Sequence, residues 1–297
     1  MKFKALVIAL AMIGAGAANA NISLPSGSGA AASSSVLFTM MNTGAATSSM
    51  FDLGLDRGQF NAAAFGGVTS GATQLATLTW NFTSNSVTSS GNWGVDATSA
   101  IASLQSASNS WSSTWNAYSA NAAGSVYDVF ASDRDGTTGA AQHLLSTVVL
   151  GSTNKIETAT NAKILLASSS SHNAYVAANT VFGTHGTADN GANIQGNGTS
   201  YQGSNGSFKT NWNGTMTMFS AAAGVDQSLG FYGLDGVAGS SGNALAITNF
   251  NGTWSMDAAA GTLTYSAQIA AVPEPSSIAM LLAGLGLMGF IARRRLS

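Results

Sequence analysis

Few residues of this sequence could catalyse a reaction or hold a metal ion. Its three histidines, His143, His172 and His185, show none of the spacing of paired metal ligands such as His-x-x-x-His. The chain has no cysteine, which excludes disulfides, a thiolate nucleophile and cysteine-ligated zinc. The residue types therefore predict no catalytic residues, no metal site and no cofactor. A secreted enzyme is an alternative that requires His143 or His185 to meet aspartates in a cleft.

Asp133 and Asp135 form the closest pair of carboxylates with a recognisable spacing. They stand in the sequence Asp-Arg-Asp-Gly, which matches the start of a calcium-binding loop. The next ligand positions hold Thr137 and Thr138, and no glutamate closes the loop at the twelfth position. We interpret the segment as a polar turn, with calcium binding as the alternative.

Three Thr-x-Thr triplets could form a surface rather than a pocket. They occupy residues 77–79, 215–217 and 262–264. Arrays of threonine on a flat face can match ice, but an array requires a regular repeat, and these triplets share no period. We therefore interpret them as exposed faces of β-strands.

The aromatic residues could stack on sugar rings or fill a core. The chain has six Trp, six Tyr and thirteen Phe, and the spacing of Trp111 and Trp115 favours the core for these two. A secreted carbohydrate-binding module is the alternative function. It requires coplanar aromatic rings exposed to solvent.

The composition is poor in charged residues and argues against a nucleic-acid-binding protein. Only 7% of the 297 residues are charged, against about 25% in an ordinary soluble domain. Between residues 21 and 272 the chain holds five basic and eleven acidic residues, a net charge of −6. Because this region has no basic patch to neutralise phosphates, we expect no nucleic-acid partner.

The hydrophobic pattern over residues 36–271 predicts a mainly β extracellular domain, a β-sandwich or a jelly-roll-like fold with one or two packed helices. Strands are expected over residues 36–41, 74–83, 126–130, 144–150, 214–220, 228–232, 244–250, 252–256 and 262–270. Asn251-Gly252 between two of these runs predicts a hairpin turn. Between residues 98 and 121, five large residues share one helical face, which predicts a helix capped by Asp96 or Thr98.

The first twenty residues have the layout of a secretory signal peptide. Lys2 and Lys4 precede an apolar run, and small residues end at Ala18-Asn19-Ala20. We expect signal peptidase to recognise Ala18 and Ala20 and to cleave after Ala20. The apolar run is shorter than the ~20 residues of a membrane-spanning helix, which argues against an anchor. Residues 21–35, rich in Gly, Ala and Ser, are predicted to be a linker.

The C-terminal residues 272–297 have three parts. Pro273, Glu274 and Pro275 come first, followed by an uncharged apolar stretch over 276–292 and a basic tail over 293–297. Seventeen residues span roughly 26 Å as a helix, which is at the short limit for a single transmembrane helix. Three adjacent arginines, Arg293, Arg294 and Arg295, favour a cytoplasmic end and place the preceding domain outside.

This order of Pro-Glu-Pro, short apolar helix and arginine cluster resembles the PEP-CTERM protein-sorting signal of Gram-negative bacteria. The resemblance covers about the last 25 residues. It implies that Pro273, Glu274 and Pro275 are the recognition motif, that residues 278–292 are a transient membrane anchor, and that the three arginines stop transfer. Some domain collections label such a tail the C-terminal domain of ice-binding proteins, which describes the tag and is no evidence of ice binding.

The resemblance also implies partners and a location. Exosortase, a membrane-embedded enzyme, would remove the helix during sorting, so the precursor is held in the inner membrane before the protein reaches the cell surface or extracellular matrix. The expected function is therefore that of a non-enzymatic surface or matrix protein, associated with exopolysaccharide and with biofilm or floc formation.

Overall fold

The computed structural model describes residues 34–67, 73–107, 110–134, 142–150, 156, 159–162, 191–193, 208–209 and 220–270. The predicted signal peptide and sorting signal lie outside these ranges, and so does the linker up to residue 33. Ser34 and Ser35 are buried, and Ser35 already belongs to the first strand. No helix among the described residues is long and apolar enough to cross a membrane.

Eleven of the described strands form one antiparallel sheet. In sheet order the main path is β4 (Ser86–Ser90), β3 (Thr73–Asn81), β13 (Thr262–Ala270), β12 (Ala246–Asp257), β11 (Leu229–Asp235), β6 (Gln142–Val149), β5 (Val126–Arg134), β1 (Ser35–Asn42), β2 (Thr47–Asp56) and β7 (Gly191–Asn193), with β10 (Ala223–Gly224) paired to β5. Two further short strands, β8 (Phe208–Lys209) and β9 (Ser220–Ala221), pair in parallel.

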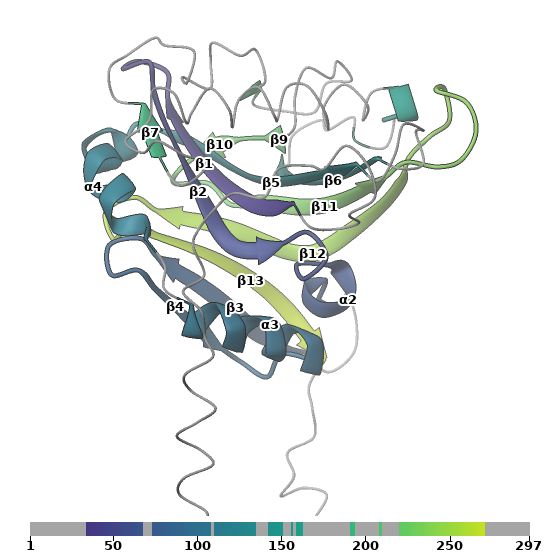
Figure 1. Cartoon of the computed structure of the whole chain (residues 1–297), viewed down its shortest axis with the longest axis horizontal. Coiled ribbons are helices and arrows are strands. Elements are labelled where there is room, and N and C mark those ends of the chain that lie inside the picture. The colour runs from purple at the N-terminus through teal and green to yellow at the C-terminus, as the bar shows by residue number, and fades with distance from the viewer. Residues whose placement is uncertain are drawn as a thin grey trace, which may run out of the picture.

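The sheet curls so that β1 and β2 lie over β12, β13 and β3 (Figure 1). The prediction of a mainly β domain is confirmed. In place of the two separate sheets of a β-sandwich or jelly roll, a single sheet folds back on itself, and β11 and β6 make the continuous link between its halves. The physical reason is that one twisted sheet of many strands can bury its own inner face by curling.

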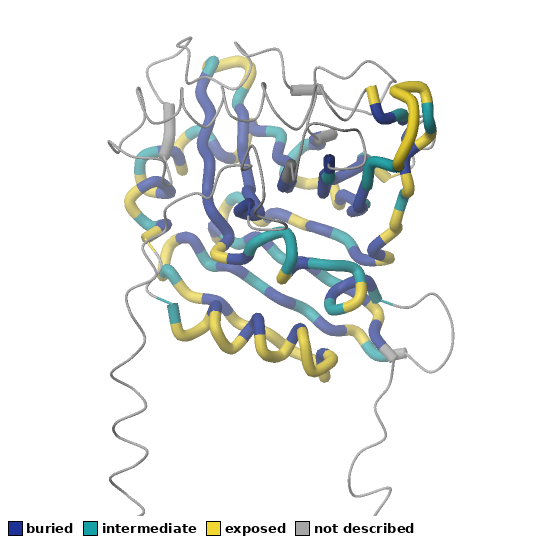
Figure 2. The backbone as a smooth tube through the Cα atoms, turned by 45° about the vertical axis from the view of Figure 1, so that its right-hand side comes forward, coloured by how far each residue is buried: buried dark blue, intermediate teal, exposed yellow. Residues whose placement is uncertain are grey.

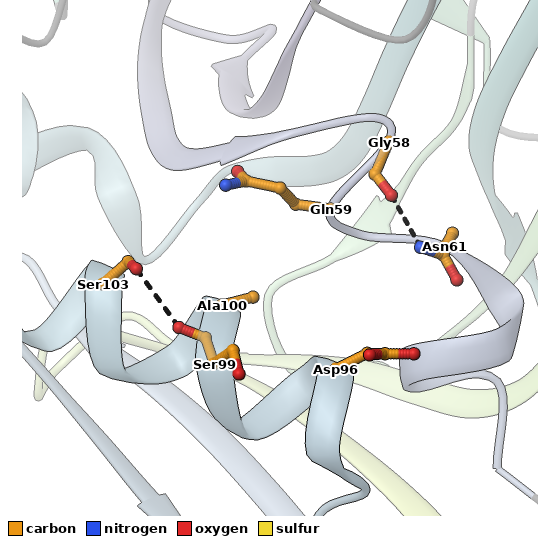
Figure 3. Close-up of a pocket in the computed structure, with 7 residues that line it drawn as sticks. All are labelled: Gly58, Gln59, Asn61, Asp96, Ser99, Ala100 and Ser103. Carbon is orange, nitrogen blue, oxygen red and sulfur yellow. Dashed lines mark hydrogen bonds between the residues drawn. The ribbon is translucent and has the colours of Figure 1, made fainter.

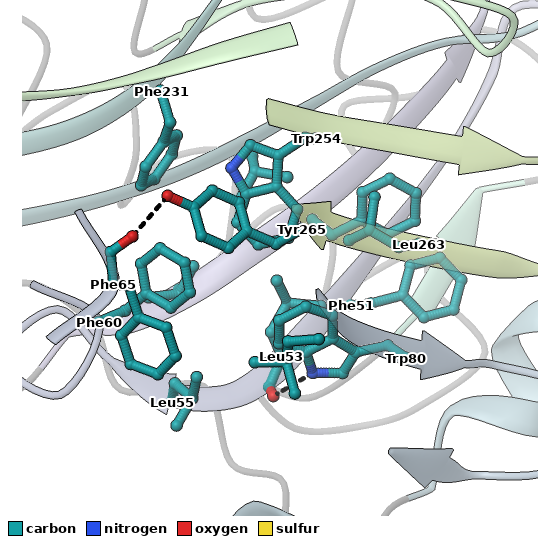
Figure 4. Close-up of a cluster of buried hydrophobic side chains, with 14 of the residues drawn as sticks. Phe51, Leu53, Leu55, Phe60, Phe65, Trp80, Phe231, Trp254, Leu263 and Tyr265 are labelled. Atoms are coloured by element: carbon teal, nitrogen blue, oxygen red, sulfur yellow. Dashed lines mark hydrogen bonds between the residues drawn. The ribbon is translucent and has the colours of Figure 1, made fainter. Parts of the chain in front are cut away.

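Aromatic side chains fill the space between the two halves of the sheet. Phe60 lies at the centre, with ring centroids 4.5 Å from Phe65, 5.1 Å from Tyr265 and 5.5 Å from Trp254 (Figure 4). The indole N–H of Trp80 donates to the carbonyl of Leu53 at 2.9 Å. This hydrogen bond joins β3 to β2 across the core and helps to fix how the two halves meet.

Three helices cover the open side of this core: α2 (Ala62–Phe65), α3 (Val95–Ser106) and α4 (Trp111–Ala122). Figure 2 shows α3 with buried residues on one face and exposed residues on the other. The five large residues predicted to share a helical face are all buried in the core, namely Ile101, Leu104, Trp111, Trp115 and Tyr118.

The prediction of one helix over 98–121 is wrong in its continuity. The helix ends at Ser106, where the C-cap residue Ala107 is extended, and α4 begins at Trp111. Serine and asparagine between the two helices favour turns over helix, because their side chains compete for backbone hydrogen bonds. The predicted capping side chains are also not used, since the N-cap is Gly94 without a side-chain bond.

The prediction of a hairpin turn at Asn251-Gly252 is wrong. Asn251 has the positive φ of 50° that such a turn needs, but β12 continues through it without reversing. The pairing with β11 shifts between Gly230 and Tyr232, so the extra residues form a β-bulge. The chain reverses instead at residues 257–261, which connect β12 to β13.

Two buried tyrosines should make the fold sensitive to alkaline pH. Burial raises the pKa of Tyr127 and of Tyr265 above the ordinary value of 10.0, and the Tyr265 hydroxyl donates to the carbonyl of Phe65 at 2.8 Å. The unfolded chain loses these protons first, so this contribution to stability is complete below about pH 10 and falls as the pH rises above it.

We expect the free energy of unfolding, measured in urea, to decrease as the pH is raised from about 9 to about 11. In the variant Tyr127→Phe/Tyr265→Phe the decrease should be smaller, because neither position can titrate. Equal pH slopes for the two proteins would contradict the assignment. The stability of the variant at neutral pH, measured in parallel, separates the pH effect from the loss of the two hydroxyl hydrogen bonds.

Candidate functional site

The structure brings one of the predicted histidines to an aspartate. His143 on β6 and Asp235 on β11 are direct partners in the strand register, and His143 Nδ1 lies 2.6 Å from Asp235 Oδ1. Arg57, just after β2, places its guanidinium 3.7 Å from the same oxygen. The exposed fractions of the side chains are 19% for His143, 42% for Asp235 and 16% for Arg57. The three side chains form a partly exposed ionic cluster.

The hollow beside this cluster is small. It measures about 90 Å³ and is lined by Arg57, Asn61, Leu145, Asp235 and Thr248 among others. Binding sites for small molecules typically measure about 300–1,000 Å³. The cluster therefore has the character of a structural tie between β2, β6 and β11. His172 and His185 lie outside the described residues.

The aspartate pair singled out for calcium is described only in part. Asp133 lies on β5 opposite His143 in the register, and Asp135 lies outside the described residues. Within the described part of the chain, no group of three or more His, Asp or Glu side chains is placed to hold a metal ion. The interpretation of the Asp133–Asp135 segment as a polar turn stays a prediction, with calcium binding as its alternative.

A larger hollow of about 330 Å³ lies between α3 and the loop that follows β2. Asp96, Ser99 and Ser103 approach from the helix, and Gln59 and Asn61 from the loop (Figure 3). Asn61 donates to the carbonyl of Gly58 at 2.6 Å and accepts from the amide of Ala64 at 3.0 Å. Its side chain is thus used to hold the loop and to cap α2 rather than directed at a ligand.

The aromatic platform required for sugar stacking is not found in the described part of the chain. Every Trp and Phe side chain of the described ranges is buried, apart from Phe208 on β8, whose side chain is not described. Tyr118, Tyr127 and Tyr265 are buried as well, and Tyr232 is half-buried. The large hydrophobic side chains that are exposed there are Leu75, Val95 and Leu150. The rings form the core, as the spacing of Trp111 and Trp115 predicted.

The outward face of β4, β3, β13 and β12 carries a regular set of hydroxyl groups, which we name the hydroxyl face. Inward side chains of these strands such as Trp80, Leu263 and Trp254 are buried, whereas the alternate positions are exposed or half-buried. The register places the outward residues in three rows of four: Ser90, Thr77, Ser266 and Thr253; Thr88, Thr79, Thr264 and Ser255; and Ser86, Asn81, Thr262 and Asp257.

Two of the Thr-x-Thr triplets therefore lie side by side, although 185 residues separate Thr79 from Thr264. Their hydroxyl oxygens are 3.0 Å apart, and those of Thr77 and Ser90 are 2.7 Å apart. The interpretation as strand faces is confirmed for these two triplets, and residues 215–217 lie outside the described residues. In the sequence, the face could be inferred only from the alternation of polar and apolar residues along each strand. The alignment of these residues in rows depends on the order and register of the strands.

The last strand leads directly towards the predicted sorting signal. β13 pairs with β3 along nine residues and with β12 along six, so it lies inside the sheet rather than at its edge. It ends at Ala270, and the predicted sorting signal begins two residues later, at Val272. The predicted site residues Ala18, Ala20, Pro273, Glu274, Pro275 and Arg293 to Arg295 all lie outside the described residues.

Comparison with known proteins identifies one segment of the chain. Residues 271–295 match the family described as the PEP-CTERM protein-sorting motif. Searches of curated proteins and of solved structures found no match. The match confirms the resemblance on which the sorting prediction depended, and it implies exosortase as the processing partner and export to the cell surface by way of a membrane-anchored precursor. The C-terminal tail of this chain is thus a PEP-CTERM protein-sorting signal.

Proposed function

We propose that this protein is a non-enzymatic component of the extracellular matrix that exosortase sorts and processes, and that it associates there with exopolysaccharide in biofilm or floc. The observation that carries the proposal is the sorting motif over residues 271–295. Signal peptidase acts first, at Ala20, and the helix over 276–292 holds the precursor until it is cut.

The fold supports this order of events. Because β13 is hydrogen-bonded on both sides, the tail continues from the interior of the sheet. An extended chain covers at most about 3.6 Å per residue, so Pro273 lies within roughly 11 Å of the end of β13. The processing enzyme therefore has to recognise the Pro-Glu-Pro motif close to the folded domain.

The described side chains favour binding or structure over catalysis. The His143–Asp235–Arg57 cluster adjoins a hollow of only about 90 Å³, and the hollow at α3 is lined by side chains that hold the local fold. These observations support a non-enzymatic role for the described domain.

The intact mass of the protein recovered from outside the producing cell tests the proposal. We expect a mass that lacks residues 1–20 and the C-terminal helix, with or without added sugar. A mass that retains residues 276–297 would mean a permanently anchored protein and would overturn the proposal. The membrane fraction of the same culture serves as the reference for the uncut precursor.

A further inference from the structure

The outward face of the sheet differs between its two halves. Over β1, β5, β6 and β11 it is covered, and Leu37, Phe130 and Leu144 are buried there against Ile156 and Leu245. Over β4, β3, β13 and β12 the described residues leave the hydroxyl face open to solvent. This open face includes β13, the strand that leads towards the sorting signal.

The hydroxyl face is almost free of charge. Ten of its twelve side chains are Ser or Thr, one is Asn81 and one is Asp257. Asp257 stands at a corner, and its carboxylate accepts from the amides of Ala259 and Ala260 at 2.9 Å each. The face therefore offers no counter-charge to a polyanion, and its only carboxylate, at the corner, is too little to hold a polycation along the rows. Among its neighbours Leu75 is exposed, and one such side chain is too little for the apolar centre of a protein interface.

The hydroxyl groups are matched in chemistry to a neutral polyhydroxyl polymer. A serine or threonine hydroxyl both donates and accepts, as a sugar hydroxyl does. Adjacent strands lie about 4.8 Å apart, and alternate residues on one strand about 6.6 Å apart, so the groups repeat in two directions. The bonds between Thr79 and Thr264 and between Thr77 and Ser90 hold part of the array in place before a ligand arrives.

A hollow at one corner gives the face an end site. It measures about 350 Å³, and its polar lining includes Asp226, Gln227 and Ser228 together with Ser255 and Asp257 of the face. Its volume lies within the range of small-molecule sites. Carboxylates accept strong hydrogen bonds from hydroxyl groups, so a sugar ring of the same polymer finds acceptors there.

We infer that the hydroxyl face, with this hollow, binds an uncharged polysaccharide lying across β4, β3, β13 and β12. Each hydrogen bond contributes only about 0.5–1.5 kcal/mol, so binding depends on many contacts along one chain and on many copies at one surface. The inference rests on the proposed function, because sorting to the surface is what brings this face to the polymer.

Native gel electrophoresis of the recovered protein in gels containing dextran or hydroxyethyl cellulose tests the inference. We expect both neutral polymers to retard the wild type, and the retardation to be clearly weaker in Thr79→Val/Thr264→Val, which lacks two of the central hydroxyl groups. Valine keeps the shape and the strand preference of threonine while removing the hydroxyl. Thr43→Val, at the exposed turn after β1, is the matched control and should migrate as the wild type does.

Several results would overturn the inference. Equal retardation of the wild type and the double variant would show that the hydroxyl face does not bind the polymer. Retardation by alginate alone would mean that the ligand is anionic. No retardation in any gel would exclude a neutral polymer, and a wild type that shapes growing ice crystals in a Thr79- and Thr264-dependent way would assign the face to ice. Circular dichroism verifies that the variants fold. If the mass experiment shows no processing, only the proposed sorting by exosortase is overturned. The gel experiment still tests polysaccharide binding, because retardation does not depend on cleavage.

Discussion

Replacing Glu274 by alanine is expected to leave the uncut precursor in the membrane. Proline disfavours helix at its own position and at the residue before it, so we expect the carboxylate at position 274 to be accessible to a processing enzyme. Loss of that carboxylate removes the charged recognition element while the fold up to Ala270 is untouched. Intact mass of the membrane fraction should show residues 271–297 still attached.

Removing Arg293 to Arg295 should give the same result for a different reason. Each arginine costs about 3 kcal/mol at the centre of a membrane-spanning helix, so the three together keep the C-terminal end cytoplasmic. Their replacement by lysine preserves the charge and should restore cleavage, whereas Ser277→Ala is the control for a neutral change beside the motif. Unchanged release of the Glu274→Ala or arginine-deleted protein would refute the sorting assignment.

The sequence predicted the strands that are rich in apolar residues and missed two in which polar residues interrupt or replace them. β2 and β4 were not predicted. In β2, Asp52 is buried, and its carboxylate accepts from the hydroxyl of Ser35 at 2.8 Å and from the amide of Gly54 at 2.8 Å. Its backbone carbonyl accepts from the indole of Trp111. Ser35 and Trp111 come from other elements, so the sequence around Asp52 alone does not show that this carboxylate can be buried in a strand.

The His143–Asp235 pair and the hydroxyl face could not be predicted from the sequence, because both depend on which strands are neighbours in the sheet. His143 and Asp235 meet because β6 and β11 are paired in one register. The rows of the hydroxyl face likewise depend on the sheet order β4, β3, β13 and β12. In contrast, the sorting signal could be recognised from the sequence alone, because its three parts are contiguous in the chain.

At Asn251 the backbone conformation expected from the Asn-Gly sequence is present, but the hairpin turn predicted from it is not. The left-handed backbone that Asn-Gly favours is present, with φ of 50° at Asn251. The chain does not reverse there because β12 is paired with β13 from Gly252 onwards and with β11 on its other side. Pairing on both sides is a tertiary constraint that overrides the turn preference of two residues.

Replacing Gly252 by alanine is expected to destabilise the domain by about 3 kcal/mol. A Cβ atom at this position would lie 2.1 Å from the hydroxyl oxygen and 2.3 Å from the ring of Tyr265. The ring cannot move aside freely, since it is fully buried and lies 4.9 Å from Trp254 and 5.1 Å from Phe60 between ring centroids. Thermal unfolding should shift down by roughly 6–12 °C for a domain of this size.

A double-mutant cycle with Tyr265 distinguishes this clash from a general effect of adding a methyl group. In a Tyr265→Leu background the ring is gone, so Gly252→Ala should cost much less than it does in the wild type. Gly242→Ala is the matched control, because its nearest neighbour would be the Ser240 hydroxyl at 3.9 Å. Equal costs of Gly252→Ala in both backgrounds would contradict the packing of Tyr265 over Gly252, and with it the reason that this bulge carries glycine.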